Sequence, residues 1–265
     1  MNQYSPRRYK RRGISQGSQL FLNLTLAIAI LLQVAYPLVD GETLRLLTLA
    51  TVYFAAGAML LHAYLAFGWR YVTTYIAITF TFALAIEQMG VRTGWPFGSY
   101  SYDPSLAYQI FGVPLVVPFA WMMMAHPVLV VARRITKNWV FLVGGFAMMG
   151  WDLFLDPQMV AAHRWTWTLV ESGIPFEPEI PISNAAGWLF AGMGLIALLH
   201  ATLPRERRKG GAGFSAVEIF IAWTFFAGVI GNFFFFDRPA VGLWAGIIFA
   251  CTYGPYAFTR WLGRP

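Results

Sequence analysis

The chain has few charged residues and a single cysteine. Only 12% of its 265 residues are Asp, Glu, Lys or Arg, whereas 58% are hydrophobic. Soluble domains carry about a quarter charged residues, so this composition excludes an ordinary soluble domain. Cys251 has no second cysteine to pair with, which excludes a disulfide within one chain and a zinc site built from cysteines. The sequence therefore indicates an integral membrane protein.

Several signatures of cofactor chemistry are also missing. The sequence has no glycine-rich phosphate loop and no adjacent pair of aspartates of the kind that holds Mg²⁺ for diphosphate chemistry. No lysine lies in the middle of an apolar run, which excludes a retinal Schiff base. His62 and His200 could ligate haem together, but a lone histidine in an apolar run is more often a hydrogen-bonded packing residue. We expect no metal and no haem.

Long apolar segments are abundant, and each approaches the roughly 20 residues that a membrane-spanning helix needs. We expect an all-α, polytopic membrane protein with about eight transmembrane helices in one domain, residues 18–261, after a basic tail, residues 1–17. The first apolar run is long and has no small-residue cleavage site, so we interpret it as a retained span rather than a signal peptide. The predicted spans are Ser18–Val39, Thr43–Phe67, Tyr71–Met89, Val113–Ala132, Asn138–Leu155, Asn184–Leu203, Phe214–Phe236 and Ala240–Trp261.

The basic residues predict the orientation of these spans. With both termini in the cytoplasm, 15 of the 19 Lys and Arg residues lie on the inner side, and only Arg45, Arg92, Arg164 and Arg238 lie outside. This distribution follows the positive-inside rule and favours the cell membrane as the location. The net charge of +7 is thus a topology signal with some attraction to anionic lipid, and it does not indicate nucleic-acid binding.

Acidic residues and irregular connections gather on the other side. Ten of the twelve acids lie in the outer half or in outer loops, and the exceptions are Glu206 and Glu218. Two long outer connections, about Gly90–Gly112 and Asp156–Ser183, are rich in Gly, Pro and aromatic residues. They are too apolar for solvated loops and too broken for helices, so we expect them to cap a cavity in the outer half.

Three acids are candidates for chemistry. Glu87 lies near the outer end of the third span, where an ionisable residue is a functional candidate. Asp152 and Asp156 are four residues apart, which places both carboxyl groups on one helical face about 5–6 Å apart at Cβ. Two such anions disfavour joint ionisation, so one tends to keep its proton. Alternatively, Glu87 reaches headgroup water, Asp152 pairs with an arginine, and Asp156 ends a helix before Pro157.

Polar and aromatic neighbours complete the candidate site. Asn184 opens the sixth span, where capping the helix would be a sufficient structural role. The aromatic residues either form an interfacial belt or line a cavity and stabilise a carbocation by cation–π attraction. The candidates for substrate binding are Trp95, Tyr100, Tyr102, Trp121, Trp151 and Trp188, with Trp165 and Trp167 nearby.

Four stretches together resemble a known family. The first reads Glu87-x-x-Gly90-x-x-Thr93-Gly94-x-Pro96-Phe97-Gly98-x-Tyr100-x-Tyr102. The others read Gly112-Val113-Pro114-Leu115-x-x-Pro118-x-x-Trp121, then Asp152-x-x-x-Asp156-Pro157, then Trp165-x-Trp167 leading to Pro181-x-x-Asn184-x-x-Gly187-Trp188. They resemble the signature of CruF-type carotenoid hydratases, over about Glu87 to Trp188.

This resemblance implies that water adds across the terminal C=C of an acyclic carotenoid end group, with no cofactor. An acid protonates the alkene, a carboxylate orients and deprotonates the water, and aromatic faces stabilise the cation. We expect Asp152 or Glu87 to be the proton donor, Asp156 the water-orienting base and Asn184 a hydrogen-bond partner. The expected partners are an apolar carotenoid and membrane lipid.

Departures from the signature leave two other functions open. Pro175-Phe176-Glu177 resembles a motif of heterodimeric-type lycopene cyclases, which protonate the same end group but exclude water. A transporter or lipid-binding scaffold would need inverted repeats or broken helices, and no matching halves are evident. The particular carotenoid, the number of ends modified and the oligomeric state are not indicated by the sequence.

Overall fold

The computed structural model describes residues 13–106 and 108–261, and this part of the chain contains eight long helices. Each is long and apolar enough to cross a membrane, which confirms the predicted all-α, multi-pass fold class. Most of the predicted basic tail, residues 1–12, lies outside the described residues. The helices are α1 (Gln16–Ala35), α2 (Gly41–Phe67), α3 (Trp69–Thr93), α4 (Val116–Ile135), α5 (Val140–Ala161), α6 (Ile182–Thr202), α7 (Ser215–Phe234) and α8 (Pro239–Trp261).

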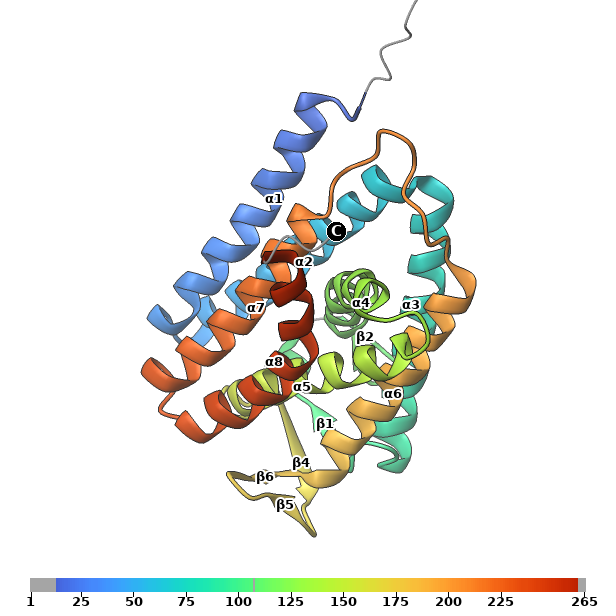
Figure 1. The fold of residues 1–265 in the computed structure, drawn as a ribbon. Helices are drawn as coiled ribbons and strands as arrows, with labels where there is room; N and C mark the ends of the chain where they lie inside the picture. The colour runs from blue at the N-terminus through green and yellow to red at the C-terminus, as the bar shows by residue number, and fades with distance from the viewer. Residues whose placement is uncertain (1–12, 107, 262–265) are drawn as a thin grey trace, which may run out of the picture.

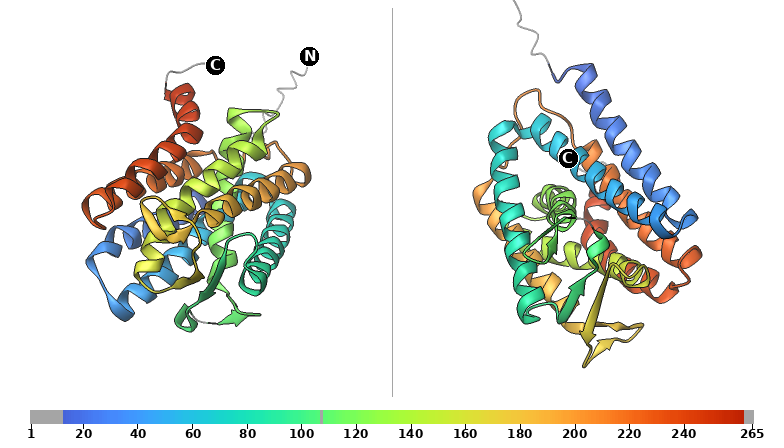
Figure 2. Two further views of the ribbon diagram at one scale, coloured as in Figure 1. Left: turned by 90° about the horizontal axis from the view of Figure 1, so that it is seen from below. Right: turned by 180° about the vertical axis from the view of Figure 1, so that it is seen from behind.

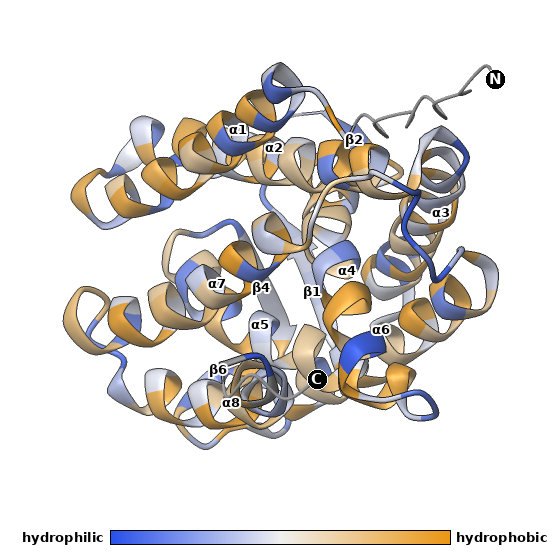
Figure 3. Cartoon of the chain, turned by 45° about the horizontal axis from the view of Figure 1, so that its top comes forward, coloured by the Kyte–Doolittle hydropathy of each residue, from blue (hydrophilic) through white to orange (hydrophobic). Residues whose placement is uncertain are grey.

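Helix α4 is the centre of the bundle (Figure 1). Fifteen of its twenty residues are buried, and it contacts α2, α3, α5, α6, α7 and α8. The other helices surround it, as the views from below and from behind also show (Figure 2). The helices consist mostly of hydrophobic residues, while many hydrophilic residues lie at helix ends and in connections (Figure 3). This pattern is the one expected of a helical bundle in lipid.

The two long connections fold together at one end of the bundle, away from the start of α1 (Figure 1). Strand β1 (Ser99–Tyr102) from the first connection pairs antiparallel with β4 (Trp165–Leu169) from the second. Two smaller antiparallel pairs, β2 (Gln109–Ile110) with β3 (Val113–Pro114) and β5 (Gly173–Ile174) with β6 (Glu177–Pro181), lie in the same connections. Short 3₁₀ turns, η1 (Tyr36–Leu38) and η2 (Pro104–Leu106), complete this end.

Several helix boundaries differ from the predictions, and one difference matters for the site. Helix α5 continues through Pro157 to Ala161, so Asp156 lies inside the helix and does not end it. Helix α3 continues to Thr93 and stops at Gly94, whose φ of +74° suits glycine. Helix α4 begins at Val116 rather than Val113, because residues 113–114 pair with β2 as a strand.

The buried histidines tie the opposite end of the bundle together. His62 Nδ1 lies 2.9 Å from His126 Nε2, and His62 Nε2 lies 2.8 Å from the carbonyl oxygen of Gly213. That oxygen can only accept, so His62 Nε2 donates to it and His126 Nε2 donates to His62. His200 lies elsewhere, and its Nδ1 accepts a bond from Arg133 at 3.1 Å. His62 is therefore a hydrogen-bonded packing residue and forms no haem-binding pair with His200.

Glycines allow α5 and α6 to approach closely near the middle of the bundle. A Cβ atom on Gly145 would lie 2.8 Å from the carbonyl oxygen of Leu189 and still closer to Met193. A Cβ atom on Gly192 would lie 2.9 Å from that of Met148. Small residues permit such contacts between helices in lipid. The two helices run in opposite directions, so the C-terminal end of α5 lies beside the first turn of α6.

We predict that Gly145→Ala destabilises the protein by about 1–3 kcal/mol, because the added methyl group meets the backbone of α6. Thermal unfolding in detergent measures the effect. Gly194→Ala is the matched control, since its new Cβ atom would meet only Phe82 at 3.6 Å, an ordinary contact. Equal melting temperatures for the two variants would contradict the close α5–α6 approach.

Candidate active site

A cavity lies beneath β1 and β4, among the ends of α2, α3, α4, α5 and α6 that face these strands. It encloses about 740 Å³, its open mouth included. Eight of its twenty lining residues are aromatic, and the other polar side chains that reach it are Thr48, Glu87, Asp156 and Asn184. The aromatic lining residues are Phe97, Tyr100, Tyr102, Trp121, Trp151, Trp165, Trp167 and Trp188. The predicted cap therefore does enclose a cavity.

Glu87 receives three hydrogen bonds from two different segments. Tyr100 and Tyr102 of β1 donate to its Oε2 atom at 2.6 and 2.7 Å, and Trp121 of α4 donates to its Oε1 atom at 2.9 Å. Only 3% of Glu87 is exposed. An indole N–H can only donate, and the two phenols donate here, so the partners suit a carboxylate. Glu87 does not simply reach headgroup water.

The two tyrosines are well suited to remain donors. Burial, followed by the negative charge of Glu87, raises the pKa of the Tyr100 and Tyr102 hydroxyls above the ordinary tyrosine value. Both hydroxyls thus keep their protons at any physiological pH. Their strand places them correctly because β1 presents residues 100 and 102 on the same face.

Asp152 and Asp156 share a single amide donor. Asn184 Nδ2 lies 3.0 Å from Asp152 Oδ2 and also donates to Asp156 Oδ2. All three side chains are at least 97% buried, and Asp152 Oδ1 has no hydrogen-bond partner among the described residues. Asn184 is the third residue of α6, and the helix begins without a side-chain cap. Asn184 therefore does not cap α6, which was its structural alternative, and instead contacts both acids.

None of the buried acids is neutralised by a cation. The ion pairs found within residues 13–106 and 108–261 involve other acids, namely Glu42, Glu177 and Glu218. Two carboxylates held beside one amide, with no cation, repel each other strongly in a low-dielectric site. One proton held by the aspartate pair relieves that repulsion. The same part of the chain contains no group of three His, Cys, Asp or Glu side chains that could hold a metal ion.

Tryptophan rings form a connected wall between the two acidic groups. Trp121 and Trp188 stack with ring centroids 4.3 Å apart and an interplanar angle of 13°. Trp151 meets Trp188 edge to face at 5.6 Å. Trp121 also donates to Glu87, and Trp188 lies one helical turn after Asn184. The ring wall therefore reaches from Glu87 to the aspartate pair.

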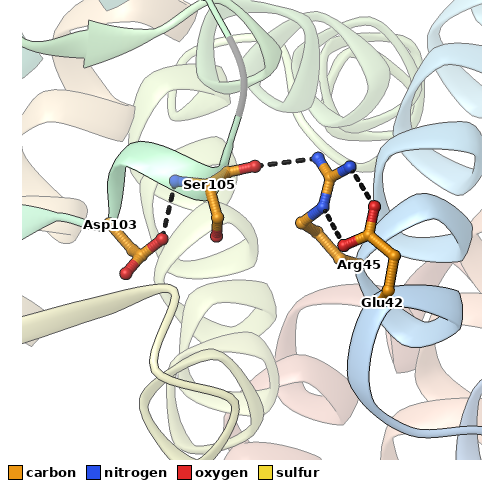
Figure 4. A network of polar contacts seen from close by, with 4 residues as sticks. All are labelled: Glu42, Arg45, Asp103 and Ser105. Carbon is orange, nitrogen blue, oxygen red and sulfur yellow. Dashed lines mark hydrogen bonds and ion pairs between the residues drawn. The ribbon is translucent and has the colours of Figure 1, made fainter.

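A polar network holds the cap against α2 (Figure 4). Arg45 forms an ion pair with Glu42 and donates from Nη1 to the carbonyl oxygen of Ser105 at 2.8 Å. The hydroxyl and backbone amide of Ser105 hold the pKa of Asp103 below its usual range. The next residue, Leu106, lines the cavity. The network thus positions the 3₁₀ turn η2 over the site.

The structure brings together most of the residues that the sequence singled out. Trp95 is the exception: it follows the end of α3, is 63% exposed and does not line the cavity. Asp152 lies behind Asp156 and Asn184 rather than at the cavity surface. Phe97 also lines the wall and was not predicted from the sequence, although it lies within the quoted motif. Thr48 and Val52 of α2 line it as well, and the sequence gives no signal for either.

The chain is similar to proteins of carotenoid biosynthesis. The model of the family described as "carotenoid biosynthesis protein" matches residues 47–252, which include every cavity residue. Bisanhydrobacterioruberin hydratase of Haloarcula japonica is 33% identical over 131 residues, which cover 46% of this chain and 42% of that relative. The match therefore spans less than half of the relative's length. No solved structure matches the chain. The family predicted from the motifs is confirmed.

We predict that Asn184→Leu lowers the stability by about 1.5–3 kcal/mol, because it removes the shared donor from two buried carboxyl groups. The same substitution should cost less in an Asp152→Asn background, where the new amide can donate to Asp156. Melting temperatures of the wild type, both single variants and the double variant form the cycle that measures this coupling. Additive effects would show that Asn184 does not link the two aspartates.

Proposed function

Because the chain belongs to the carotenoid biosynthesis protein family, we propose that it is a carotenoid hydratase. The proposed reaction adds water to the terminal C=C of an acyclic carotenoid end group. The observation that carries the proposal is a cavity in which buried carboxyl groups face one another across aromatic rings. Hydration of an alkene needs these three elements: a proton donor, an acceptor for a water proton and a surface that stabilises the cation.

The aspartate pair is the proton donor in this proposal. Asp156 lines the cavity whereas Asp152 does not, so Asp156 is the group that touches the substrate. It transfers its proton to the CH carbon of that double bond, away from the carbon with two methyl groups, and the electron pair of the C=C forms the new C–H bond. A tertiary carbocation remains on the neighbouring carbon. Asp152 and Asn184 position Asp156 and stabilise the negative charge that it gains. This assignment replaces the expected donor role of Asp152 or Glu87.

Glu87 is the proposed base. Its three donors fix the carboxylate against the cavity wall and spread its charge, so it can orient a water molecule toward the cation. Water oxygen forms the new C–O bond, and one of its protons passes to Glu87. The cycle closes when that proton returns to the aspartate pair, so no oxidant, metal or other cofactor is consumed.

The tryptophan wall stabilises the intermediate. Stacked faces of Trp121 and Trp188 and the face of Trp151 present π-electrons to a cation. Their attraction grows as charge develops and is weak toward the neutral alkene, which lowers the barrier. The substrate is an apolar carotenoid taken from lipid. We further propose that the chain lies in the cell membrane with both termini in the cytoplasm and the cavity in the outer half of the bilayer.

Glu177, the residue that would support a cyclase, occupies a different place. It forms an ion pair with Arg238, one residue before α8, and does not line the cavity. A carboxylate engaged in this way is poorly placed to protonate an alkene. This geometry favours hydration over cyclisation.

We predict that Asp156→Asn and Glu87→Gln each lower product formation by about 10²–10⁴-fold, the usual contribution of a general acid or base. The protein is produced in a bacterium that accumulates lycopene, and pigments are separated by chromatography and mass spectrometry. The wild type should give a product heavier by one water per modified end, with an unchanged chromophore. Glu177→Gln is the control and should retain activity.

Other products would contradict the proposal in defined ways. A product of unchanged mass and shortened chromophore, lost in Glu177→Gln, would establish cyclisation. Full activity of Asp156→Asn in normally expressed protein would remove the aspartate pair from the mechanism.

We also predict that Gly90→Ala lowers activity by up to about 100-fold without unfolding the protein. A Cβ atom on Gly90 would lie 2.7 Å from the Tyr100 hydroxyl, so it would displace that donor from Glu87. Tyr100→Phe in the Gly90→Ala background tests the cause, because removing the hydroxyl should then cost little further activity. A full additional loss from Tyr100→Phe would show that the donor had not moved.

A further inference from the structure

A second, larger cavity lies on the other side of α5 and opens between α1 and α7. It encloses about 1190 Å³, its mouth included. Phe154 of α5 and Phe220, Trp223 and Ala227 of α7 form part of its wall, together with Tyr36 at the end of α1. None of these residues has a role in the proposed chemistry. We call this cavity the α1–α7 groove.

The α1–α7 groove adjoins the acid cavity. Six residues line both spaces, and they come from three helices: Thr48 and Val52 of α2, Met123 of α4, and Trp151, Leu155 and Met159 of α5. Five of the six are apolar, and Thr48 donates its hydroxyl to the carbonyl oxygen of Leu44 at 2.7 Å. The wall that the two spaces share is therefore apolar.

Most polar side chains of the groove are already satisfied by the protein. The Trp223 indole donates to Gln33, Gln158 donates to the carbonyl oxygen of Phe154 at 2.9 Å, and Thr224 donates to that of Phe220 at 2.9 Å. The hydroxyls of Tyr36 and Thr51 are buried and have no partner in the described part of the chain. A ligand without polar groups would lose little hydrogen bonding here, so the groove suits a hydrocarbon chain.

The mouth of the groove faces outward between two membrane-spanning helices. Three of its residues are among the exposed large apolar side chains: Val34 of α1, Ile230 of α7 and Phe235 just after α7. In a bilayer this face meets lipid. The groove thus extends from this lipid-facing side to the apolar wall that it shares with the acid cavity.

We propose that the α1–α7 groove holds the polyene chain of the substrate and admits it sideways from the bilayer, end group first. The inference rests on the proposed hydratase function. Only the terminal double bond reacts, so the long remainder of the molecule must lie outside the acid cavity. The groove provides an apolar space for it directly beside the acid cavity.

Added bulk at Ala227, on the groove wall, tests this proposal. Ala227→Leu and Ala227→Trp form a graded series, and Ala197→Trp is the control on the exposed side of α6, outside both cavities. Each is placed in the Asp156→Asn background, produced in a lycopene-accumulating bacterium and purified in detergent. We expect Ala227→Trp to retain about tenfold less pigment per protein than the control, with Ala227→Leu between them.

The same substitutions at residues 227 and 197, made in the protein that keeps Asp156, separate the groove proposal from the proposed function. We expect product to fall with bulk at residue 227 and to be unchanged in Ala197→Trp. If the active protein makes product but residue 227 affects neither pigment nor product, the groove proposal is overturned and the hydratase stands. If the pigment depends on residue 227 but no product forms, the groove stands and the hydratase fails.

Two further measurements test whether a variant is misfolded and whether the groove holds phospholipid instead of pigment. Size-exclusion profiles and melting temperatures identify a misfolded Ala227→Trp, in which case Ala227→Leu decides. Phospholipid is quantified alongside the pigment. Loss of bound phospholipid with unchanged pigment would assign the groove to a lipid acyl chain and overturn the proposal.

Discussion

Three carboxyl groups buried in an apolar membrane protein need hydrogen-bond donors from the protein itself. The architecture of the end of the bundle that carries β1 and β4 follows from that need. Strand β1 supplies two phenols to Glu87, α4 supplies an indole, and α6 supplies the amide that Asp152 and Asp156 share. Each donor belongs to a different element from its acceptor. The acids therefore connect the cap, the central helix and the α5–α6 pair into one unit.

The close contact of α5 and α6 is the structural condition for the aspartate site. Glycines bring the two backbones together near the middle of the bundle. The C-terminal end of α5 therefore lies close enough to the first turn of α6 for the Asn184 amide to reach both aspartates. An amide has two N–H donors and can serve both carboxyl groups at once. A wider helix separation would leave at least one acid without a partner at considerable cost.

In the proposed hydratase, the two cavities divide the tasks that hydration of a long apolar substrate imposes. Acid–base chemistry needs polar groups and a water molecule, whereas the rest of the substrate needs a surface without unsatisfied polar atoms. The acid cavity has the buried carboxyl groups, and the adjoining α1–α7 groove has polar side chains that are mostly paired with the protein. Trp151 of α5 lines both spaces and directly precedes Asp152 in the sequence. This part of α5 therefore lies at the boundary between the acid cavity and the groove.

The sequence by itself determined the fold class, the eight helices and the family, because hydropathy and charge alternate along the chain and the motifs are local. It also identified Glu87, Asp152, Asp156 and Asn184 as the polar candidates. Only the tertiary structure decided which aspartate reaches the cavity, that Asn184 bonds both acids instead of capping α6, and that Trp95 points away. These outcomes depend on how α5, α6 and the cap pack against one another. Contacts between residues tens of positions apart leave no periodic signal in a single sequence.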